Sequence, residues 1–274
     1  MGPGNLGSAL ALSLHAAGYE VKCIAARDVR DRRSRALARS VRARLVKFGK
    51  QSMESELVWI AVPDDAITAV ARALAAQENW KERIVFHSSG ALTSDELAPL
   101  RDKGARVASV HPMMTFVRGA VPAMAGVPFA IEGDAAAARS ARSIVAKLGG
   151  RAFTIQKQNK VLYHAFGSLA SPLLVALMAS LEDVGGAAGI RQRDIKAAIT
   201  PLLMRTLRNY LEHDAASAFS GPLIRGDVAT VGKHLVELKK LPHVRAVYVA
   251  LASAALKLLP VKNRSGFKRL LTSR

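Results

Sequence analysis

Two patterns of apolar residues alternate over the first 155 residues of the chain. Short, continuous apolar runs are typical of strands that are buried on both faces of a parallel sheet. Between these runs, apolar residues recur every three or four positions, which predicts helices. We expect strands over 19–26, 57–62, 83–87, 106–111, 127–133 and 151–155, and helices over 7–17, 65–76, 94–103 and 135–148. The third helix begins with a capping-box pair, Thr93 and Glu96.

The strand pattern ends after Ile155, and only helical spacing follows. Helices are expected over 157–185, 191–213, 227–240 and 242–259. We therefore predict an α/β domain over 1–155 and an all-helical domain over 156–274. The uncharged run 165–181 is 17 residues long and contains Pro172. A membrane span needs about 20 apolar residues, so we interpret this run as a buried core helix.

Three glycines near the start, Gly2, Gly4 and Gly7, have the spacing of a dinucleotide-binding turn that opens a helix. Gly2 permits the tight turn, Gly4 lets a pyrophosphate approach the backbone, and Gly7 permits close packing of the helix. We predict that the backbone of this turn, including Asn5 and Leu6, binds the phosphates.

A turn of this kind normally follows a strand at the centre of the sheet, yet only Met1 precedes Gly2 here. Loss of a central strand would remove much of the stability of the sheet. We therefore expect the natural chain to begin roughly six to ten residues upstream, with a strand of typical length there.

The residues after the strand at 19–26 indicate which dinucleotide binds. NAD sites place an acidic residue at this position to hold the ribose 2′-hydroxyl. Here Arg27 stands there, and a guanidinium suits the 2′-phosphate of NADP. The sequence therefore favours NADP. Two observations leave the choice open: Asp28 follows directly, and Arg27 can also be the start of a basic, solvated helix.

The net charge of +19 is concentrated in two segments. Residues 27–50 include ten basic and two acidic residues, and residues 257–274 include six basic and no acidic ones. Both segments lack interleaved aromatic residues and any nucleic-acid-binding motif, so we prefer a basic solvated surface to nucleic-acid binding. The single cysteine, Cys23, excludes an intramolecular disulfide and fits a cytoplasmic protein. No spacing of His, Asp or Glu predicts a metal site.

Six motifs together resemble one family: "GPGNLGSAL", "AVPDDAI", "HSSGAL", "VHPMMTF", "YHAFGSLAS" and "GPLIRGDVATVGKHL". The chain resembles bacterial Rossmann-like proteins that carry a C-terminal domain of unknown function, DUF2520. These are related to the group of 6-phosphogluconate dehydrogenase, pyrroline-5-carboxylate reductase and coenzyme F420-dependent NADP oxidoreductase. The resemblance covers nearly the whole chain and implies an NADP-binding Rossmann-type domain followed by an all-α domain for dimerisation and substrate binding. The chain departs from the pattern in its missing first strand and at Pro172, where the family has asparagine.

Sheets of this type bind ligands at the carboxyl ends of their strands. Val62 and Pro63 end one strand and are predicted to contact the cofactor; the next residue, Asp64, can instead cap a helix. A second loop, Ser88, Ser89 and Gly90, follows the strand at 83–87. In the related dehydrogenases a Ser-Gly loop lies beside the nicotinamide, which implies this place for Ser89 and Gly90. His87, the last residue of that strand, is equally compatible with a core histidine.

Three further side chains are candidates for proton transfer. His111 ends a strand, and its imidazole can exchange hydrogen bonds with a substrate oxygen near neutral pH, unless it only packs against the following turn. Lys160 and His164 lie four apart, on one face of a helix. The resemblance to 6-phosphogluconate dehydrogenase implies that Lys160 is the general acid or base and that His164 orients it. The alternative is a solvated lysine beside a core pair of Tyr163 and His164.

Arg225 and Asp227 lie in a loop between predicted helices, where the arginine can bind a substrate carboxylate or phosphate or form a structural pair with the aspartate. The leading hypothesis is a homodimeric, cytoplasmic, NADP-dependent oxidoreductase that moves a hydride to or from a small polar substrate. Ser89, His111, Lys160 and His164 would surround the nicotinamide. The alternatives are a non-catalytic NADP-binding sensor or scaffold and, third, a nucleic-acid-binding protein.

Overall fold

The computed structural model describes residues 2–49, 55–77, 79–117 and 123–272 and divides into two compact units, Met1–Ala170 and Ser171–Arg274. The last strand of the first unit ends at Thr154. The helix that follows, α6 (Lys160–Ala170), bonds to the sheet through its first residue and so belongs to the first unit. This division into units does not test the domain boundary expected at residue 155, which remains a prediction.

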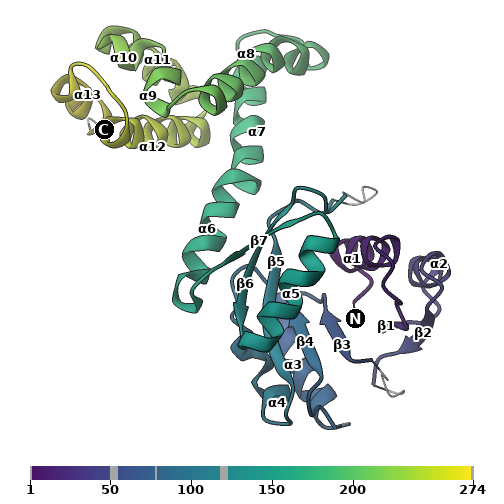
Figure 1. The fold of residues 1–274 in the computed structure, drawn as a ribbon. Helices are drawn as coiled ribbons and strands as arrows, with labels where there is room; N and C mark the ends of the chain where they lie inside the picture. The colour runs from purple at the N-terminus through teal and green to yellow at the C-terminus, as the bar shows by residue number, and fades with distance from the viewer. Residues whose placement is uncertain (1, 50–54, 78, 118–122, 273–274) are drawn as a thin grey trace. The chain divides into compact units, whose positions relative to one another are not determined.

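A mixed sheet in the order β3-β4-β5-β6-β7 forms the centre of the first unit (Figure 1). Its strands are β3 (Leu57–Ile60), β4 (Ile84–His87), β5 (Arg106–Pro112), β6 (Pro128–Gly133) and β7 (Arg151–Thr154). β3, β4 and β5 pair in parallel, and so do β6 and β7. A separate parallel pair consists of β1 (Cys23–Ala26) and β2 (Arg44–Lys47).

The predicted α/β class with a Rossmann-type sheet is confirmed, and the sheet is parallel except at β6. This strand runs antiparallel to β5. A parallel crossover usually contains a helix, and the described residues between β5 and β6 form none. The chain therefore returns along the sheet in the opposite direction.

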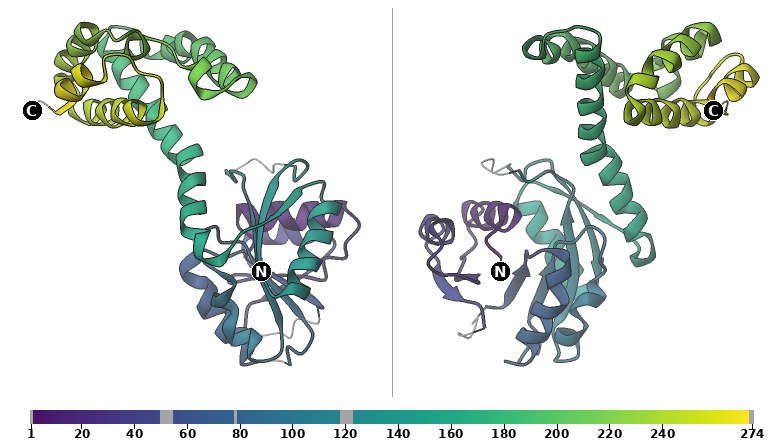
Figure 2. Two further views of the ribbon diagram at one scale, coloured as in Figure 1. Left: turned by 60° about the vertical axis from the view of Figure 1, so that its left-hand side comes forward. Right: turned by 180° about the vertical axis from the view of Figure 1, so that it is seen from behind.

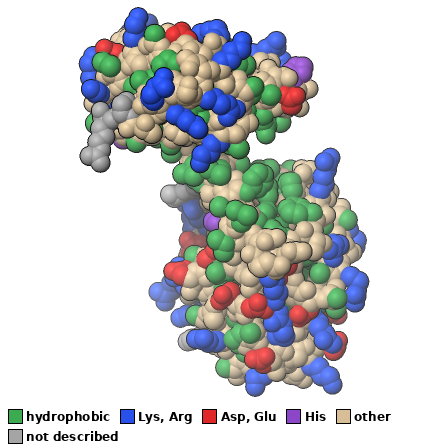
Figure 3. All heavy atoms as spheres, turned by 90° about the vertical axis from the view of Figure 1, so that its left-hand side faces the viewer, with side chains coloured by type: hydrophobic (Ala, Val, Ile, Leu, Met, Phe, Trp, Pro, Cys, Tyr) green, Lys and Arg blue, Asp and Glu red, His purple; other side chains and the backbone are tan. Residues whose placement is uncertain are grey.

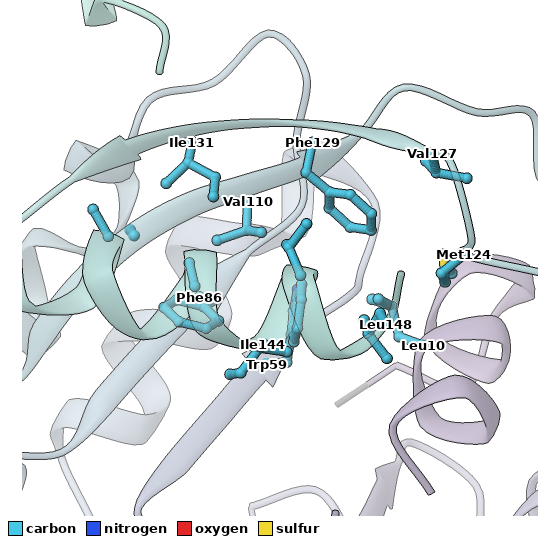
Figure 4. Packing of buried hydrophobic residues seen from close by; sticks show 14 of the residues in the cluster. Leu10, Trp59, Phe86, Val110, Met124, Val127, Phe129, Ile131, Ile144 and Leu148 are labelled. Carbon is cyan, nitrogen blue, oxygen red and sulfur yellow. The ribbon is translucent and has the colours of Figure 1, made fainter. Parts of the chain in front are cut away.

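Alternate residues of the central strands face two hydrophobic layers. Figure 2 shows the strands and the surrounding helices from two further sides. Trp59 and Phe86 lie in the layer under α1 (Asn5–Ala16) and α5 (Ala135–Lys147). Val58 and Val85 face α3 (Asp64–Ala75), the short helix η1 (Ser94–Leu97) and α4 (Ala98–Arg101). Figure 4 shows the first of these layers, in which aromatic and branched side chains from the strands interlock with α5. Helices thus cover both faces, as the continuous apolar runs predict.

The sequence pattern did not predict α2 (Arg32–Ser40) or β2. Only Leu37 and Ala38 give α2 a buried apolar stripe, and the rest of the helix is mostly basic. Its N-cap is Asp31, whose carboxylate accepts bonds from the Ser34 amide and hydroxyl, each at 2.7 Å. The basic surface expected here therefore exists, but on a packed helix. Lys and Arg side chains are spread over both units on the face drawn in Figure 3.

The second unit is entirely helical over its described residues. Its helices are α7 (Pro172–Ala187), α8 (Gln192–Glu212), α9 (Ala215–Ala218), α10 (Pro222–Arg225), α11 (Val228–Glu237), η3 (Leu238–Lys240), α12 (Pro242–Leu258) and α13 (Arg264–Thr272). Val231, Leu235, Leu256 and Phe267 form its buried centre. The single helix expected over 157–185 is instead η2 (Lys157–Asn159), α6 and α7, because the chain leaves the helical conformation at Ser171. Pro172 then occupies the first turn of α7, where its missing N–H removes no helical bond.

The prediction of a buried core helix over 165–181 is wrong for the single chain. Large apolar side chains on α6 and α7 are exposed, among them Leu162 (75%), Leu169 (66%) and Val175 (65%). By length and hydropathy the stretch Lys157–Ala187 also meets the criteria for a membrane span, criteria that an apolar helix of a water-soluble protein meets too.

A cavity of about 600 Å³ lies between β1 and β3. Ile24 and Leu57 from the strands and Leu10, Leu14 and Ile144 from the covering helices form the apolar part of its wall, and polar residues such as Glu20, Lys22 and Glu56 line the rest. The Gly2 amide donates to the Ala25 carbonyl at 3.2 Å, so the chain enters the glycine turn beside β1. Figure 1 shows this entry point between β1 and β3. The dimensions and the two facing strands suit one further extended, apolar strand; Met1 itself lies outside the described residues.

We expect the protein to become more stable when an apolar strand of roughly six to ten residues is joined ahead of Gly2, because the strand would fill this cavity and pair with β1 and β3. The expected rise in melting temperature is about 10 °C, a few kcal/mol for a chain of this size. Thermal unfolding and NADPH calorimetry would compare this variant with a Gly/Ser extension of equal length. Equal melting temperatures and equal affinities would refute the prediction.

Candidate active site

The glycine turn is packed tightly on one side and open on the other. Gly2 has φ +84°, and a Cβ there would collide with the Ala61 carbonyl at the end of β3. A Cβ on Gly7 would collide with the Gly2 carbonyl. In contrast, a Cβ on Gly4 would meet no atom within 4 Å. Each position thus fits the role predicted for it, and the open side at Gly4 is the one that a pyrophosphate requires.

The N-terminus of α1 is suited to an anion. The helix starts at Asn5, its N-cap Gly4 supplies no side-chain bond, and its first turn contains no acidic residue. The first amides of a helix have no carbonyl partner within it and carry partial positive charge. Asn5 itself donates to the Phe116 carbonyl at 3.0 Å, which ties the turn to the loop after β5. The residues present therefore fit the phosphates of a dinucleotide.

Arg27 directly follows β1 and is exposed. Asp28 accepts a bond from the Arg30 amide at 2.8 Å, so its carboxylate is engaged in the turn between β1 and α2. Arg27 thus presents an exposed guanidinium at the strand end, beside Asp28, which is also exposed and has one carboxylate oxygen bonded within the turn. This supports the 2′-phosphate interpretation, while the choice between NADP and NAD remains a prediction.

The loop after β4 is fixed by its own side chains. His87 is buried, and one ring nitrogen, Nε2, lies 2.9 Å from the Thr93 carbonyl while Nδ1 accepts from the Ser89 amide at 3.1 Å. A carbonyl can only accept, so Nε2 must carry the proton. His87 is therefore a core histidine that closes the loop, the alternative considered for it. Trp59 on β3 also fixes the loop, because its indole Nε1 donates to Ser88 Oγ at 2.7 Å.

Ser89 uses all of its polar atoms within the protein. Its hydroxyl donates to Asp64 at 2.7 Å and accepts from the Ala91 and Leu92 amides at 3.2 and 2.9 Å. A hydroxyl has one donor and two acceptor sites, so none is left for a ligand. The side chain of Asp64 does not cap α3, because the N-cap of this helix is Pro63. Pro63 is exposed, and Val62 before it is half-buried. Ser89 thus shapes the loop, and its predicted catalytic role stays untested.

Lys160 is fully buried beneath this loop. Its ammonium donates to the Ser89 carbonyl at 2.9 Å and to the Ser109 hydroxyl on β5. Glu132 on β6, also buried, lies 3.9 Å away. Lys160 and His164 do share a helix, as the spacing predicts, but the solvated-lysine alternative does not describe this structure.

Gly90, His111 and His164 meet at the surface of the loop. A Cβ on Gly90 would lie 2.8 Å from His164 Cδ2 and 2.9 Å from His111 Nε2, so only glycine lets the two rings approach. On its other side, His111 Nδ1 is 2.7 Å from the Tyr163 hydroxyl. The polar atom that His111 presents beside Gly90 is therefore Nε2, and it is available to a substrate oxygen or nitrogen.

The charges of this cluster follow from its burial. Burial, assisted by the positive charge of Lys160, lowers the pKa of both His87 and His111 to about 4. Burial also lowers the pKa of Lys160 to about 8, although the negative charges of Glu132 and Asp64 act in the other direction and raise it. Burial raises the pKa of Tyr163 to about 12. At neutral pH both histidines are therefore uncharged, Tyr163 is a phenol, and most Lys160 is an ammonium.

Sequence patterns did not identify four residues of this cluster as participants: Tyr163, Asp64, Glu132 and Ser109. Glu132 lies within an apolar strand run, where a lone acidic residue signals a buried partner. Tyr163 was considered only as a core residue, and Asp64 only as a helix cap. Their partners are 20 to 52 positions away in the sequence, so no local pattern identified them.

The two predicted substrate residues belong to the second unit. Arg225 ends α10 and is exposed. Asp227 is the N-cap of α11 and accepts from the Thr230 amide at 3.0 Å, and its bonds to Thr230 lower the pKa of its carboxyl. Asp227 thus has a structural task, and the substrate role of both residues stays a prediction.

The comparisons with known proteins agree with this architecture. Residues 1–112 match the Rossmann-like domain family, and residues 127–255 match the domain of unknown function DUF2520. The chain therefore combines a Rossmann-like domain with a DUF2520 domain, as the motifs indicated. No curated protein matches it.

Three solved structures illustrate the shared fold. The candidate NADP oxidoreductase BF3122 from Bacteroides fragilis has a TM-score of 0.76 and 20% identity over 92% of this chain and 95% of its own. Protein TM1727 from Thermotoga maritima has a TM-score of 0.73 and 23% identity over 98% and 97%. The imine reductase from Myxococcus stipitatus, in complex with NADP+, has a TM-score of 0.70 and 16% identity over 99% and 98%. At these identities the likeness establishes the fold.

The low pKa of the two buried histidines predicts a pH-dependent stability. Between about pH 6.5 and 4 the unfolded chain binds protons that His87 and His111 in the folded protein do not, so the free energy of unfolding falls as the pH falls. Each histidine contributes up to ~1.4 kcal/mol per pH unit in this window. Urea unfolding from pH 4 to 7 should show a shallower slope for His87→Gln than for the wild type. Parallel slopes would contradict this assignment.

Proposed function

We propose that this protein is an NADP-dependent oxidoreductase that transfers a hydride to or from a small polar substrate. The observation that carries the proposal is one continuous line of contacts along the carboxyl ends of the strands. The glycine turn touches the end of β3, Asp64 beyond β3 bonds Ser89 beyond β4, and Gly90 touches His111 at the end of β5. Parallel sheets of this type bind dinucleotides at this place.

A bound nicotinamide cofactor supplies or accepts the hydride. The chain itself binds and orients the reactants. The amides of Gly4, Asn5, Leu6 and Gly7 would hold the phosphates, Val62 and Pro63 after β3 would contact the ribose, and the Ser88–Gly90 loop would contact the nicotinamide. Arg27 would bind the 2′-phosphate, which a carboxylate at the same place would repel. This supports NADP over NAD.

The substrate group that the cluster fits is a polarised carbonyl or imine. His111 Nε2 and the His164 ring lie together beside Gly90, where the two imidazoles can bond the heteroatom of such a group. His111 is neutral at pH 7, so its Nε2 can donate or accept according to its tautomer. Arg225 and Asp227 remain candidates for contact with a substrate carboxylate.

We further propose a homodimer. The apolar side chains of α6 and α7, including Leu162, Phe166, Leu169 and Val175, are 60–75% exposed in the single chain. Several large apolar side chains exposed on one helix are typical of a protein interface. A second copy, which presents the same helices, is the occupant that we propose.

NADPH-dependent turnover tests the function most directly. With a panel of keto acids and cyclic imines, His111→Gln should lower kcat by about 10²–10⁴-fold, the usual range for a group that assists proton transfer. The matched control is His234→Gln, which alters a second His–Tyr pair, His234 with Tyr248 at 3.0 Å in the second unit. Equal kcat values for the two variants would contradict the role of His111. NADPH binding without turnover on the whole panel would favour the sensor or scaffold.

The cofactor choice depends on Arg27. We expect Arg27→Ala to weaken NADPH binding by about 10- to 100-fold, because a charge-assisted bond contributes ~1.5–3 kcal/mol, and to leave NADH binding nearly unchanged. Calorimetry with both nucleotides measures the ratio, with Arg42→Ala as a control on the same basic surface. A similar loss for NADPH and NADH would place Arg27 outside the 2′-phosphate site.

The dimer depends on the apolar face of α6. Leu169→Asp should convert the dimer to a monomer in analytical ultracentrifugation, because it buries an unpaired charge in the proposed interface. Leu258→Asp, at a side chain 80% exposed on α12, is the control and should leave the dimer intact. A monomeric wild-type protein would refute the proposal. A wild-type protein that stays in solution only with detergent, or that sediments together with lipid vesicles, would indicate instead that the stretch Lys157–Ala187 binds a membrane.

A further inference from the structure

The Lys160 ammonium is buried and already has three partners within the protein. An ammonium has three N–H groups. Here the Ser89 carbonyl, at 2.9 Å, and the Ser109 hydroxyl accept two of them, and the Glu132 carboxylate lies 3.9 Å away as an ion-pair partner. The side chain has no solvent-exposed surface. A substrate would have to displace one of these partners to reach the nitrogen.

Glu132 extends the network to a third strand and a turn. One carboxylate oxygen accepts from the Ser94 amide at 2.6 Å, and the other accepts from the Ser94 hydroxyl at 2.8 Å. The buried charges of Lys160 and Glu132 therefore connect α6, the loop after β4, β5, β6 and the start of η1. Buried ion pairs are costly to desolvate and survive only when further hydrogen bonds satisfy them, as they do here.

The position of Lys160 in α6 gives this network a consequence for the site. Lys160 is the first residue of α6, and Tyr163 and His164 follow three and four positions later, on the same face. The bond from Lys160 to Ser89 therefore fixes how the first turn of α6 meets the loop. Tyr163 reaches His111, and His164 reaches Gly90, only from this placement.

We propose that Lys160, held by Glu132, is a positioning residue whose ammonium fixes the Ser88–Gly90 loop against α6 and so sets His111 and His164 next to each other beside Gly90. The inference rests on the proposed function, because it assigns contact with the substrate to the histidines instead of the lysine. It departs from the role that resemblance to 6-phosphogluconate dehydrogenase implies for Lys160. It also gives Glu132 a function in the site, because this carboxylate holds the Lys160 ammonium in place.

A rescue experiment separates positioning from proton exchange. Lys160→Met leaves Glu132 without its cation and lets the loop shift, and displacements of about 1 Å can cost about 10²-fold in rate. We expect kcat to fall by this order while the Kd for NADPH changes little. The double variant Lys160→Met with Glu132→Gln removes both charges and should recover about tenfold in kcat, as coupled neighbours do.

The control is Lys157→Met, one turn before Lys160, which removes an exposed pair with Asp95 and should leave kcat unchanged. If the double variant is no more active than Lys160→Met, the positioning role is overturned, because no change at Glu132 can replace a missing proton donor. The double variant also decides the question if Lys160→Met alone fails to fold.

A spectroscopic measurement is independent of turnover. In ¹⁵N NMR of the protein without substrate, Lys160→Met should shift the His111 ring nitrogens and the Gly90 amide, and the double variant should move them back toward the wild type. Unchanged His111 and Gly90 signals in Lys160→Met would overturn the inference. If these shifts occur but the wild type turns over no substrate, the positioning role stands and the proposed oxidoreductase function fails.

Discussion

The bond between the Lys160 ammonium and the Ser89 carbonyl is the contact on which the candidate site depends. It joins the first helix after the sheet to the loop that follows β4. The sequence makes room for it with small polar residues: Ser109 interrupts a strand whose neighbours, Ala108 and Val110, are fully buried and apolar. Because a buried ammonium without partners is very unfavourable, the surrounding oxygens leave the lysine essentially one arrangement.

Glycines provide the second constraint, since the backbone must come close at two places. At the turn, Gly2 and Gly7 pack against each other and against the end of β3, which leaves Gly4 facing open space. At the far end of the same line, Gly90 admits two imidazoles to within van der Waals contact of the loop. The distance between these places is spanned by Asp64 and Ser89, which bond directly. The phosphate end and the reactive end are therefore held by one connected set of contacts.

The sequence predicted those parts of this architecture that local patterns encode. Continuous apolar runs identified β3, β4 and β5. Successive side chains of these strands point to opposite faces of the sheet, and both faces are apolar because helices cover both. It missed α2, whose apolar stripe is only Leu37 and Ala38 among arginines, and it could not predict the direction of β6, since side-chain alternation is the same in both directions. The candidate site was likewise predictable only where local patterns encode it. Candidate residue types at strand ends were found, but Lys160 and its partners Ser89 and Ser109 are 71 and 51 positions apart, and only the fold brings them together.

A crystal structure of the protein with NADP bound tests the central claim most directly. The account predicts the pyrophosphate against the amides of Gly4–Gly7, the nicotinamide beside Gly90 with His111 Nε2 facing the substrate space, and the Lys160 nitrogen still bonded to the Ser89 carbonyl. A Lys160 side chain turned toward the nicotinamide, or a nucleotide bound away from the glycine turn, would contradict it.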